Sequence, residues 1–272
     1  MSKRNTQQAK TAARERLRAE RERQAKRDKT RRQAIVAGSI VAVLAIAGGA
    51  SYLVMQGLKP SQWEAAKDKA LVAPKNTTGK NHTTVILGEE SAKKTVIAYE
   101  DPRCPVCASF EQAVGPTVEK DLKDGKYKLQ YVGATFLDNN LPGEGSRNAL
   151  SALGAALNVS KEAFASYKTA LYSAKYHPEE TDDKFKKDAY LIEIADTVAE
   201  LKGNKAFQKD VEDGTFDRWA IEMSKNFDDN KYDIQGTPSF VMDGKKITGP
   251  DTKNAPMTVE DWNTAVDKVM KG

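Results

Sequence analysis

Cysteine and histidine are scarce in this chain, which contains only two of each among its 272 residues. A small secreted domain held together by disulfides would carry about four to eight cysteines, so this chain must be stabilised by a packed core. A structural zinc site needs four ligands. The two histidines, His82 and His177, lie too far from the cysteines in sequence to match a common zinc module. We therefore predict no metal site.

Acidic residues are scarce at the N-terminus. Residues 1–32 carry 13 Lys or Arg against 4 Asp or Glu, whereas the rest of the chain carries 30 against 34. The overall net charge of +5 therefore describes neither part. Binding to nucleic acid is one use of such a basic segment, but a solvated stretch attracted to anionic lipid is the simpler account. We predict contact with membrane lipid and no nucleic-acid partner.

Charged residues are absent from residues 33–58, a run of 26 residues. As a helix that rises about 1.5 Å per residue, this run exceeds the roughly 30 Å hydrocarbon core of a bilayer. We therefore predict a single transmembrane helix at residues 34–58. The basic residues 1–33 should remain in the cytoplasm, which makes the C-terminal domain of this single-pass cell-membrane protein extracytoplasmic.

A cleaved signal peptide is the alternative interpretation of the same run. Gly48, Gly49 and Ala50 are small enough to form a cleavage site. Apolar residues continue beyond them as far as Met55, however, and the basic region is unusually long. Retention as an anchor is therefore favoured.

The remainder of the chain predicts a tether at residues 59–83 and one α/β domain at residues 84–272. Apolar patterns and turn signals predict strands at residues 84–87, 95–99, 128–136, 238–242 and 245–247. They predict helices at residues 61–71, 107–114, 116–122, 146–157, 161–173, 184–201, 205–225 and 258–270, with Gly115 and Pro116 bending or restarting the helix there. Residues from about 139 to 234 are helical almost throughout, which is far longer than an ordinary connection between strands. We therefore predict a helical insertion.

Both cysteines lie in one tetrapeptide, Cys104-Pro105-Val106-Cys107, between a predicted buried strand and a predicted helix. This spacing at a helix N-terminus exposes the first sulfur and keeps the second within bonding reach. Unpaired backbone N–H groups and the helix dipole favour the thiolate of Cys104, the attacking species. Cys107 is then the more buried, resolving thiol. A purely structural disulfide in so short a loop would constrain little of the chain.

Three segments carry a resemblance to a known family. They are Gly88 with Ala92, residues 99–110 around the cysteines, and Gly236-Thr237-Pro238-Ser239-Phe240 near the end. Together they resemble the DsbA-like thiol:disulfide oxidoreductases of the thioredoxin superfamily. The resemblance covers roughly residues 84 to 272, and it implies a thioredoxin-like α/β fold with a helical insertion.

The resemblance also implies roles for residues near the dithiol. Pro238 is expected to be cis and to lie beside the sulfurs, with Thr237 supplying main-chain contacts to an extended substrate. Asp101, Pro105 and Val106 are expected to neighbour the active site, and Val106 stands where strongly oxidising members have a histidine.

Ala98 stands where many members have a buried carboxylate that is thought to move protons. Glu100 or Asp101 is a candidate substitute. The alternatives are a solvated loop position for Glu100 and a helix N-cap for Asp101, and we favour the cap.

The other polar residues near the motif are expected to be solvated. Arg103 is expected to point into solvent, as are His82 and His177, and the acidic run at residues 179–183 is expected to form a solvated loop. The three tryptophans are expected to pack in the core or an interface: Trp63, Trp219 and Trp262.

The expected function is an extracytoplasmic exchange of disulfides with exported proteins through the dithiol, as an oxidase. A reductase or isomerase on the same fold, for example one serving cytochrome c maturation, is the nearest alternative. A membrane-tethered peptide-binding domain with a vestigial dithiol is another. The resemblance implies reoxidation by a membrane partner of the DsbB or vitamin K epoxide reductase type, and no bound cofactor is needed.

Overall fold

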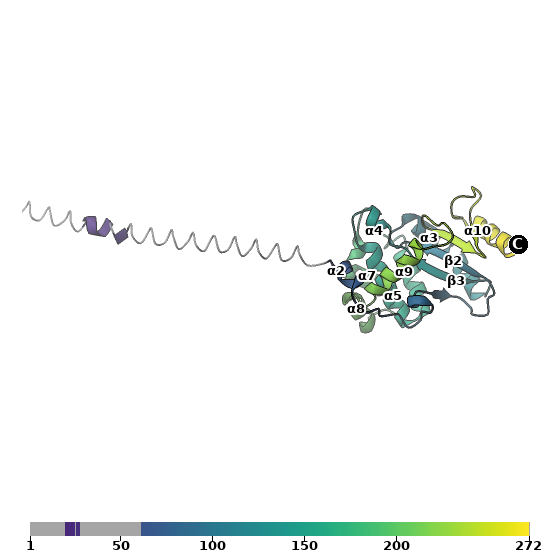
Figure 1. The fold of residues 1–272 in the computed structure, drawn as a ribbon, viewed down its shortest axis with the longest axis horizontal. Coiled ribbons are helices and arrows are strands. Elements are labelled where there is room, and N and C mark those ends of the chain that lie inside the picture. Colours follow the sequence, from purple (N-terminus) through teal and green to yellow (C-terminus); the bar gives the residue numbers. More distant parts are fainter. Residues whose placement is uncertain (1–19, 25, 28–60, 272) are drawn as a thin grey trace, which may run out of the picture. The chain divides into compact units, whose positions relative to one another are not determined.

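The computed structural model describes residues 20–24, 26–27 and 61–271. Residues 62–272 form one unit, distinct from residues 1–61, and this unit contains the sheet, both cysteines and the predicted insertion (Figure 1). The predicted transmembrane helix at residues 34–58 lies outside the described residues. Within the described ranges, no helix is both long enough and apolar enough to span a bilayer.

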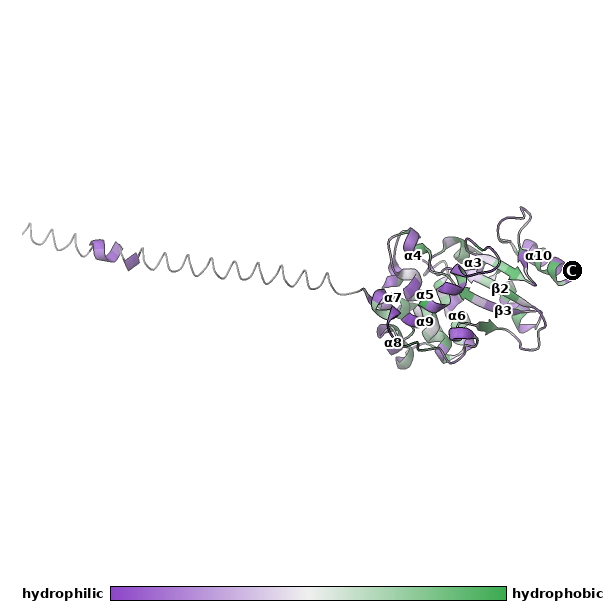
Figure 2. Ribbon diagram, in the orientation of Figure 1, coloured by the Kyte–Doolittle hydropathy of each residue, from purple (hydrophilic) through white to green (hydrophobic). Residues whose placement is uncertain are grey.

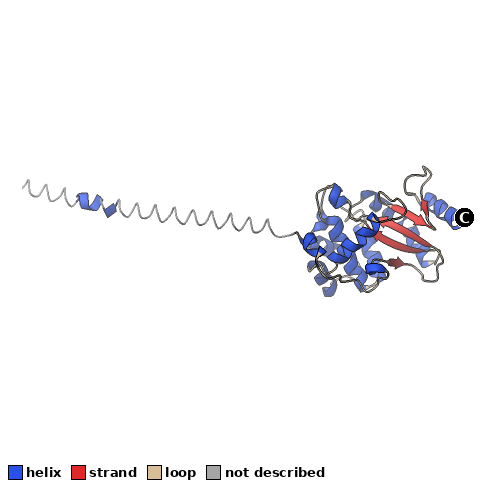
Figure 3. Cartoon of the chain, in the orientation of Figure 1, coloured by secondary structure: helices blue, strands red, loops and turns tan. Residues whose placement is uncertain are grey.

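A five-stranded sheet forms the centre of the domain (Figure 3). Its strands run in the order β1-β3-β2-β4-β5, and only the β2–β3 pair is parallel. The bounds are β1 (Val85–Leu87), β2 (Thr95–Glu100), β3 (Lys128–Gly133), β4 (Ser239–Met242) and β5 (Lys245–Ile247). The continuous apolar run in β2 matches its central position, because a strand covered on both faces has no solvent side. Figure 2 shows hydrophobic residues concentrated along the strands.

Helices cover both faces of the sheet. Helix α3 (Pro105–Lys123) lies beside α10 (Val259–Lys271), and Phe110 of α3 packs on Phe240 of β4 with ring centroids 4.5 Å apart. On the opposite face, α9 (Asp217–Asp228) places Phe227 against Tyr99 of β2. Successive residues of β2 therefore enter different halves of the core, as the pleat requires.

The predicted helical insertion is present between β3 and β4. It contains α4 (Leu137–Asn140), α5 (Gly145–Val159), α6 (Lys161–Leu171), α7 (Asp188–Ala195), α8 (Lys205–Glu212) and α9. Helix α5 is buried along most of its length and contacts α6, α7, α8 and α9. The insertion therefore has its own core, with α5 at its centre.

Several predicted boundaries are wrong. The helix expected at residues 184–201 is a 3-10 turn, η2 (Lys184–Lys186), followed by the shorter α7. The helix expected at residues 205–225 is divided into α8 and α9 near Gly214, whose φ of 59° is left-handed and ends a helix readily. Conversely, α3 is one helix that contains Pro116.

The segment expected to be a tether is partly packed on the domain. Trp63 in α2 (Gln62–Lys67) is only 2% exposed, and Gln62 Nε2 donates to Asp217 Oδ2 over 2.8 Å. Burial of a large aromatic side chain away from water is favourable, so Trp63 holds this segment against the domain. All three tryptophans are buried, as expected.

Candidate active site

Cys104 occupies the N-cap of α3, directly after β2. Pro105 follows at the first helical position, where its fixed φ suits the helix and its missing N–H is not needed. The Cys104 Sγ accepts a hydrogen bond from the Cys107 backbone N–H over 3.3 Å. Both cysteines are free thiols. The helix N-terminus therefore presents a donor and a positive dipole end to the first sulfur.

The two thiols differ in electrostatic environment. The hydrogen bond from the Cys107 side chain is the largest cause that lowers the pKa of Cys104 to about 6, and backbone N–H groups add to it against the effect of burial. Burial raises the pKa of Cys107 well above its ordinary value. At neutral pH, Cys104 is therefore the thiolate and Cys107 the protonated partner. This pKa is lower than the helix dipole alone would give, because the second thiol is also a donor.

The Thr237–Pro238 peptide bond is cis and lies beside the first sulfur. Cys104 Sγ is 3.4 Å from the carbonyl oxygen of Thr237, to which its thiol donates. A cavity of about 610 Å³ opens next to these atoms. Its lining includes Val106, Thr237, Pro238, Pro250, Ala255 and Met257. Val106 is 49% exposed, whereas Cys104 is only 6% exposed. Asp251, Asn254 and Asp261 also line the cavity, so its surface is partly apolar and partly polar.

Asp101 is fully buried behind this loop, and the predicted N-cap role is wrong because Cys104 caps α3 instead. Its carboxylate accepts hydrogen bonds from Ser146 Oγ (2.6 Å), Arg103 N (3.0 Å) and Leu137 N (3.2 Å). Burial raises the pKa of Asp101 to about 7. Asp101 therefore fastens the cysteine loop to the insertion.

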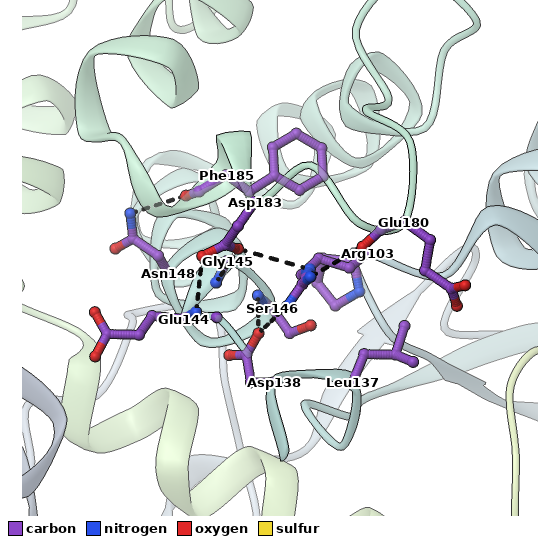
Figure 4. A network of polar contacts seen from close by, with 12 residues as sticks. Arg103, Leu137, Asp138, Glu144, Gly145, Ser146, Asn148, Glu180, Asp183 and Phe185 are labelled. Carbon is purple, nitrogen blue, oxygen red and sulfur yellow. Dashed lines mark hydrogen bonds and ion pairs between the residues drawn. The ribbon is translucent and has the colours of Figure 1, made fainter. Parts of the chain in front are cut away.

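Arg103 does not point into solvent as the sequence suggested. It is 2% exposed, and its guanidinium lies 3.0 Å from Asp138 Oδ1 and 3.6 Å from Asp183 Oδ1 (Figure 4). The guanidinium also donates to the Glu180 carbonyl over 3.0 Å. These partners lie 35 to 80 positions away in sequence, and nothing local to Arg103 indicates them.

The two aspartates that hold Arg103 also organise the start of α5. Asp183 accepts from the backbone N–H groups of Glu144 and Gly145, so the acidic loop at residues 179–183 is not wholly solvated as expected. A Cβ on Gly145 would lie 2.4 Å from Asp183 Oδ1, which only glycine avoids. Asp138 accepts from Ser146 N over 2.9 Å. The insertion therefore supplies a rigid backing to the residue before Cys104.

Glu100 is buried at the end of β2 rather than in a solvated loop. Lys168 Nζ of α6 lies 3.3 Å from Glu100 Oε2 and 2.6 Å from Glu111 Oε2, and Thr169 Oγ1 donates to Glu111 Oε1 over 2.6 Å. Burial raises the pKa of Glu100 to about 6 against the attraction of Lys168. The charge of Glu100 also acts on Cys107.

Glu111 and Lys168 are site residues that the sequence analysis missed. Glu111 lies four residues after Cys107 on α3, so both are on one face of the helix. That spacing was visible in the sequence. Lys168 carried no such signal, because only the packing of α6 brings it to Glu100 and Glu111.

The histidines have different environments. His82 is exposed as expected, but His177 is half-buried, with its ring stacked on Tyr172 and Nε2 3.2 Å from the Pro102 carbonyl oxygen. Burial lowers the pKa of His177. The described part of the chain contains no group of three or more metal-ligating side chains that could hold an ion.

Comparisons with known proteins agree with this geometry. A family model described as Thioredoxin matches residues 80–268. Disulfide bond formation protein D of Bacillus subtilis (strain 168) is 26% identical over 164 residues, which cover 60% of this chain and 68% of that protein. Serine/threonine-protein kinase PknE of Mycobacterium tuberculosis is 25% identical over 166 residues, but these span only 29% of the kinase.

Solved structures show the same fold. BdbD from Bacillus subtilis superposes with a TM-score of 0.57 at 22% identity, over 75% of this chain and 100% of that one. DsbA from Mycobacterium tuberculosis superposes with a TM-score of 0.52 at 22% identity, over 67% of this chain and 99% of that one.

Proposed function

Because the chain belongs to the thioredoxin family, we propose that it is a thiol:disulfide oxidoreductase that exchanges disulfides with protein substrates through Cys104 and Cys107. One observation carries the proposal. The Cys104 sulfur is at once the N-cap of α3, a neighbour of the Thr237 carbonyl and a thiol with a pKa of about 6. A structural thiol needs none of these features. The name of the relative from Bacillus subtilis supports the same activity.

Thiol–disulfide exchange at these cysteines is balanced in atoms and electrons and needs no cofactor. In the oxidised enzyme, a substrate thiolate attacks the Cys104 sulfur, and the Cys104–Cys107 bond breaks as Cys107 leaves as a thiolate and takes up a proton. The second substrate thiolate then attacks the substrate sulfur of the mixed disulfide, and Cys104 leaves as a thiolate. Two electrons pass to the enzyme. In the reductive direction, Cys107 resolves the mixed disulfide instead.

The substrate segment is proposed to lie against Thr237 and Pro238. Proline has no N–H, so the carbonyl of Thr237 is the main-chain group available beside the sulfur. Val106 and Met257 line the adjoining cavity and favour apolar substrate side chains next to the cysteine. Glu100 is proposed to accept and return the proton of Cys107, since Ala98 cannot.

We propose that net flow is oxidative. Stabilisation of the Cys104 thiolate stabilises the reduced enzyme, which makes the disulfide a better oxidant. The expected potential lies between about −120 mV, the value of the strongest bacterial oxidant, and about −270 mV, that of thioredoxin. Equilibration with glutathione buffers measures it. A potential below that of thioredoxin would instead support the reductase alternative.

Trapping tests the division of labour between the thiols. Cys107→Ser should accumulate mixed disulfides with exported proteins, and Cys104→Ser should not. The reverse pattern would exchange the two roles. If the wild-type dithiol showed no turnover with a reduced unfolded protein, the protein would instead be a peptide-binding domain with a vestigial dithiol.

The domain is proposed to act outside the cytoplasm, held by the uncharged run at residues 34–58. The basic residues that precede this run support the orientation. A reporter fused after Gly272 should be active only outside, and protease added to intact spheroplasts should digest the domain. Reoxidation is assigned to a membrane partner of the DsbB or vitamin K epoxide reductase type, whose loss should leave Cys104 and Cys107 reduced in the cell.

A further inference from the structure

The Tyr131 hydroxyl is buried and has no partner. Among the described side chains, only its Oη and Thr237 Oγ1 are buried without a hydrogen bond. Tyr131 itself is 0% exposed. Buried hydroxyls are almost always paired, because an unpaired one loses its bonds to water and gains nothing in return. Such a group points to a partner that exists in another state of the protein.

Tyr131 lies on the face of the sheet that is nearest to the dithiol. Tyr131 of β3 is paired in register with Ala98 of β2, and Glu100 lies two residues further along β2 on the same face. This face is the one covered by α3, which carries Cys107.

Phe164 and Gly133 flank the ring of Tyr131. Phe164 of α6 contacts it edge-on, with centroids 5.1 Å apart. Gly133, the next residue of β3 on the same face, has no side chain, and a Cβ there would lie 3.2 Å from Tyr131 Cε1. The ring that carries the hydroxyl is therefore closely packed on both sides.

Cys107 is among the groups that interact electrostatically with the Tyr131 hydroxyl. After burial, the strongest influences that raise its pKa are Glu100 and then Cys107, followed by Asp101 and Glu111. The pKa of Tyr131 lies well above its ordinary value, so the hydroxyl keeps its proton and is able to donate a hydrogen bond.

Apart from the Thr237 hydroxyl, the other donors near Cys107 are already engaged. Cys107 faces Cys104 at the N-cap of α3, Glu111 on α3, Glu100 on β2, Tyr172 at the C-cap of α6, and Thr237 before β4. The Tyr172 hydroxyl donates to the Asp101 carbonyl over 3.1 Å. Lys168 is shared between the two glutamates. Tyr131 Oη and Thr237 Oγ1 are therefore the two buried hydroxyls without a hydrogen-bond partner among the described side chains. Of the two, Tyr131 is the one that lies on the sheet, beside the strand that carries Glu100.

We propose that Tyr131 donates a hydrogen bond to the Cys107 thiolate that forms when a substrate holds Cys104 in a mixed disulfide. This role rests on the proposed disulfide exchange. No proton or electron leaves Tyr131: the Cys104–Cys107 bond breaks, the electron pair goes to the Cys107 sulfur, and the hydroxyl stabilises that charge until a carboxyl group returns a proton. The hydroxyl is unpaired in the dithiol because its partner is transient.

Tyr131→Phe tests the proposal, with Tyr99→Phe on the opposite face of the sheet as the matched control. In Tyr131→Phe, glutathione attached to Cys104 should be displaced by Cys107 about tenfold more slowly, the effect of losing one hydrogen bond to a charged group. In a Cys104→Ser background, the pKa of Cys107 should rise by about one unit. Stability to urea should not fall, because no existing hydrogen bond is removed.

Unchanged displacement and an unchanged pKa of Cys107 would overturn the proposal. So would a loss of stability with normal kinetics, which would show a structural role. If the wild-type protein failed to exchange disulfides at all, the proposed function would be wrong. The pKa of Cys107 with and without Tyr131→Phe, in the Cys104→Ser background, would still test the hydrogen bond from Tyr131.

Discussion

The guanidinium of Arg103 donates to the carboxylate of Asp138 across 3.0 Å, and both side chains are almost fully buried. Arg103 immediately precedes Cys104, and Asp138 belongs to the first helix of the insertion. The ion pair therefore joins the loop that precedes α3 to the helical insertion.

Arg103→Met should destabilise the protein by about 3 kcal/mol, because it removes the ion pair of Asp183 and leaves Asp138 with Arg147 as its remaining cation. Urea unfolding measures the change. Lys123→Met is the matched control: it removes the exposed pair with Glu119, and such pairs contribute at most about 1 kcal/mol. Equal losses in the two variants would contradict a structural role for Arg103.

The pKa of Cys104 should depend on the side chain at position 107. Alkylation of Cys104 against pH should show a midpoint at about 6 in the reduced wild type, because the Cys107 side chain donates to its sulfur. Cys107→Ala removes that donor and should move the midpoint upward, whereas Cys107→Ser keeps a hydroxyl donor and should move it less. A midpoint that is the same in both variants would exclude the hydrogen bond as the main cause.

The same thiolate gives the reduced protein a pH-dependent stability. The folded pKa of Cys104 lies below its ordinary value of 9.0, so the contribution is complete above about pH 9 and is lost as pH falls through about 6. The oxidised protein lacks this group. The stability of the reduced form relative to the oxidised form should therefore rise between about pH 6 and pH 9, as thermal unfolding of both forms would show.

Lys168→Met should be more harmful at alkaline pH than at acidic pH. The variant leaves Glu100 and Glu111 buried without a cation, which raises their pKa values. A carboxyl group with a raised folded pKa loses stability as pH rises through that pKa. We expect a loss of about 3 kcal/mol at pH 8 and a smaller one at pH 5, measured by urea unfolding.

Lys168→Arg keeps the positive charge and is the control for this series. It should retain most of the stability at both pH values. A loss in Lys168→Met that does not change with pH would point to lost packing instead of unpaired carboxylates.

Gly154→Ala should weaken the contact between α5 and α9. A Cβ at Gly154 would lie 2.8 Å from Trp219 Cε3, and overpacking of a core costs about 1 to 3 kcal/mol. Gly236→Ala is the control, because a Cβ there would meet nothing within 4 Å. Thermal unfolding compares them, and a neutral Gly154→Ala would show that the helices separate at little cost.

The sequence by itself determined the features that depend on near neighbours. A continuous apolar run specifies the central strand. Two cysteines three positions apart, with Pro105 between them, specify a dithiol at a helix N-terminus. The absence of strand patterns over about a hundred residues specifies a helical insertion. Each of these depends on backbone geometry or on spacing within a few residues, which can be read directly.

Only the tertiary structure decided which charged residues are buried. Nothing near Arg103, Asp101 or Glu100 distinguishes them from solvated loop residues. Arg103 is buried because Asp138 and Asp183 compensate its charge, and Glu100 because Lys168 arrives from α6. Burial of a charge is tolerable only beside a specific partner, and the partner is chosen by packing between segments distant in sequence.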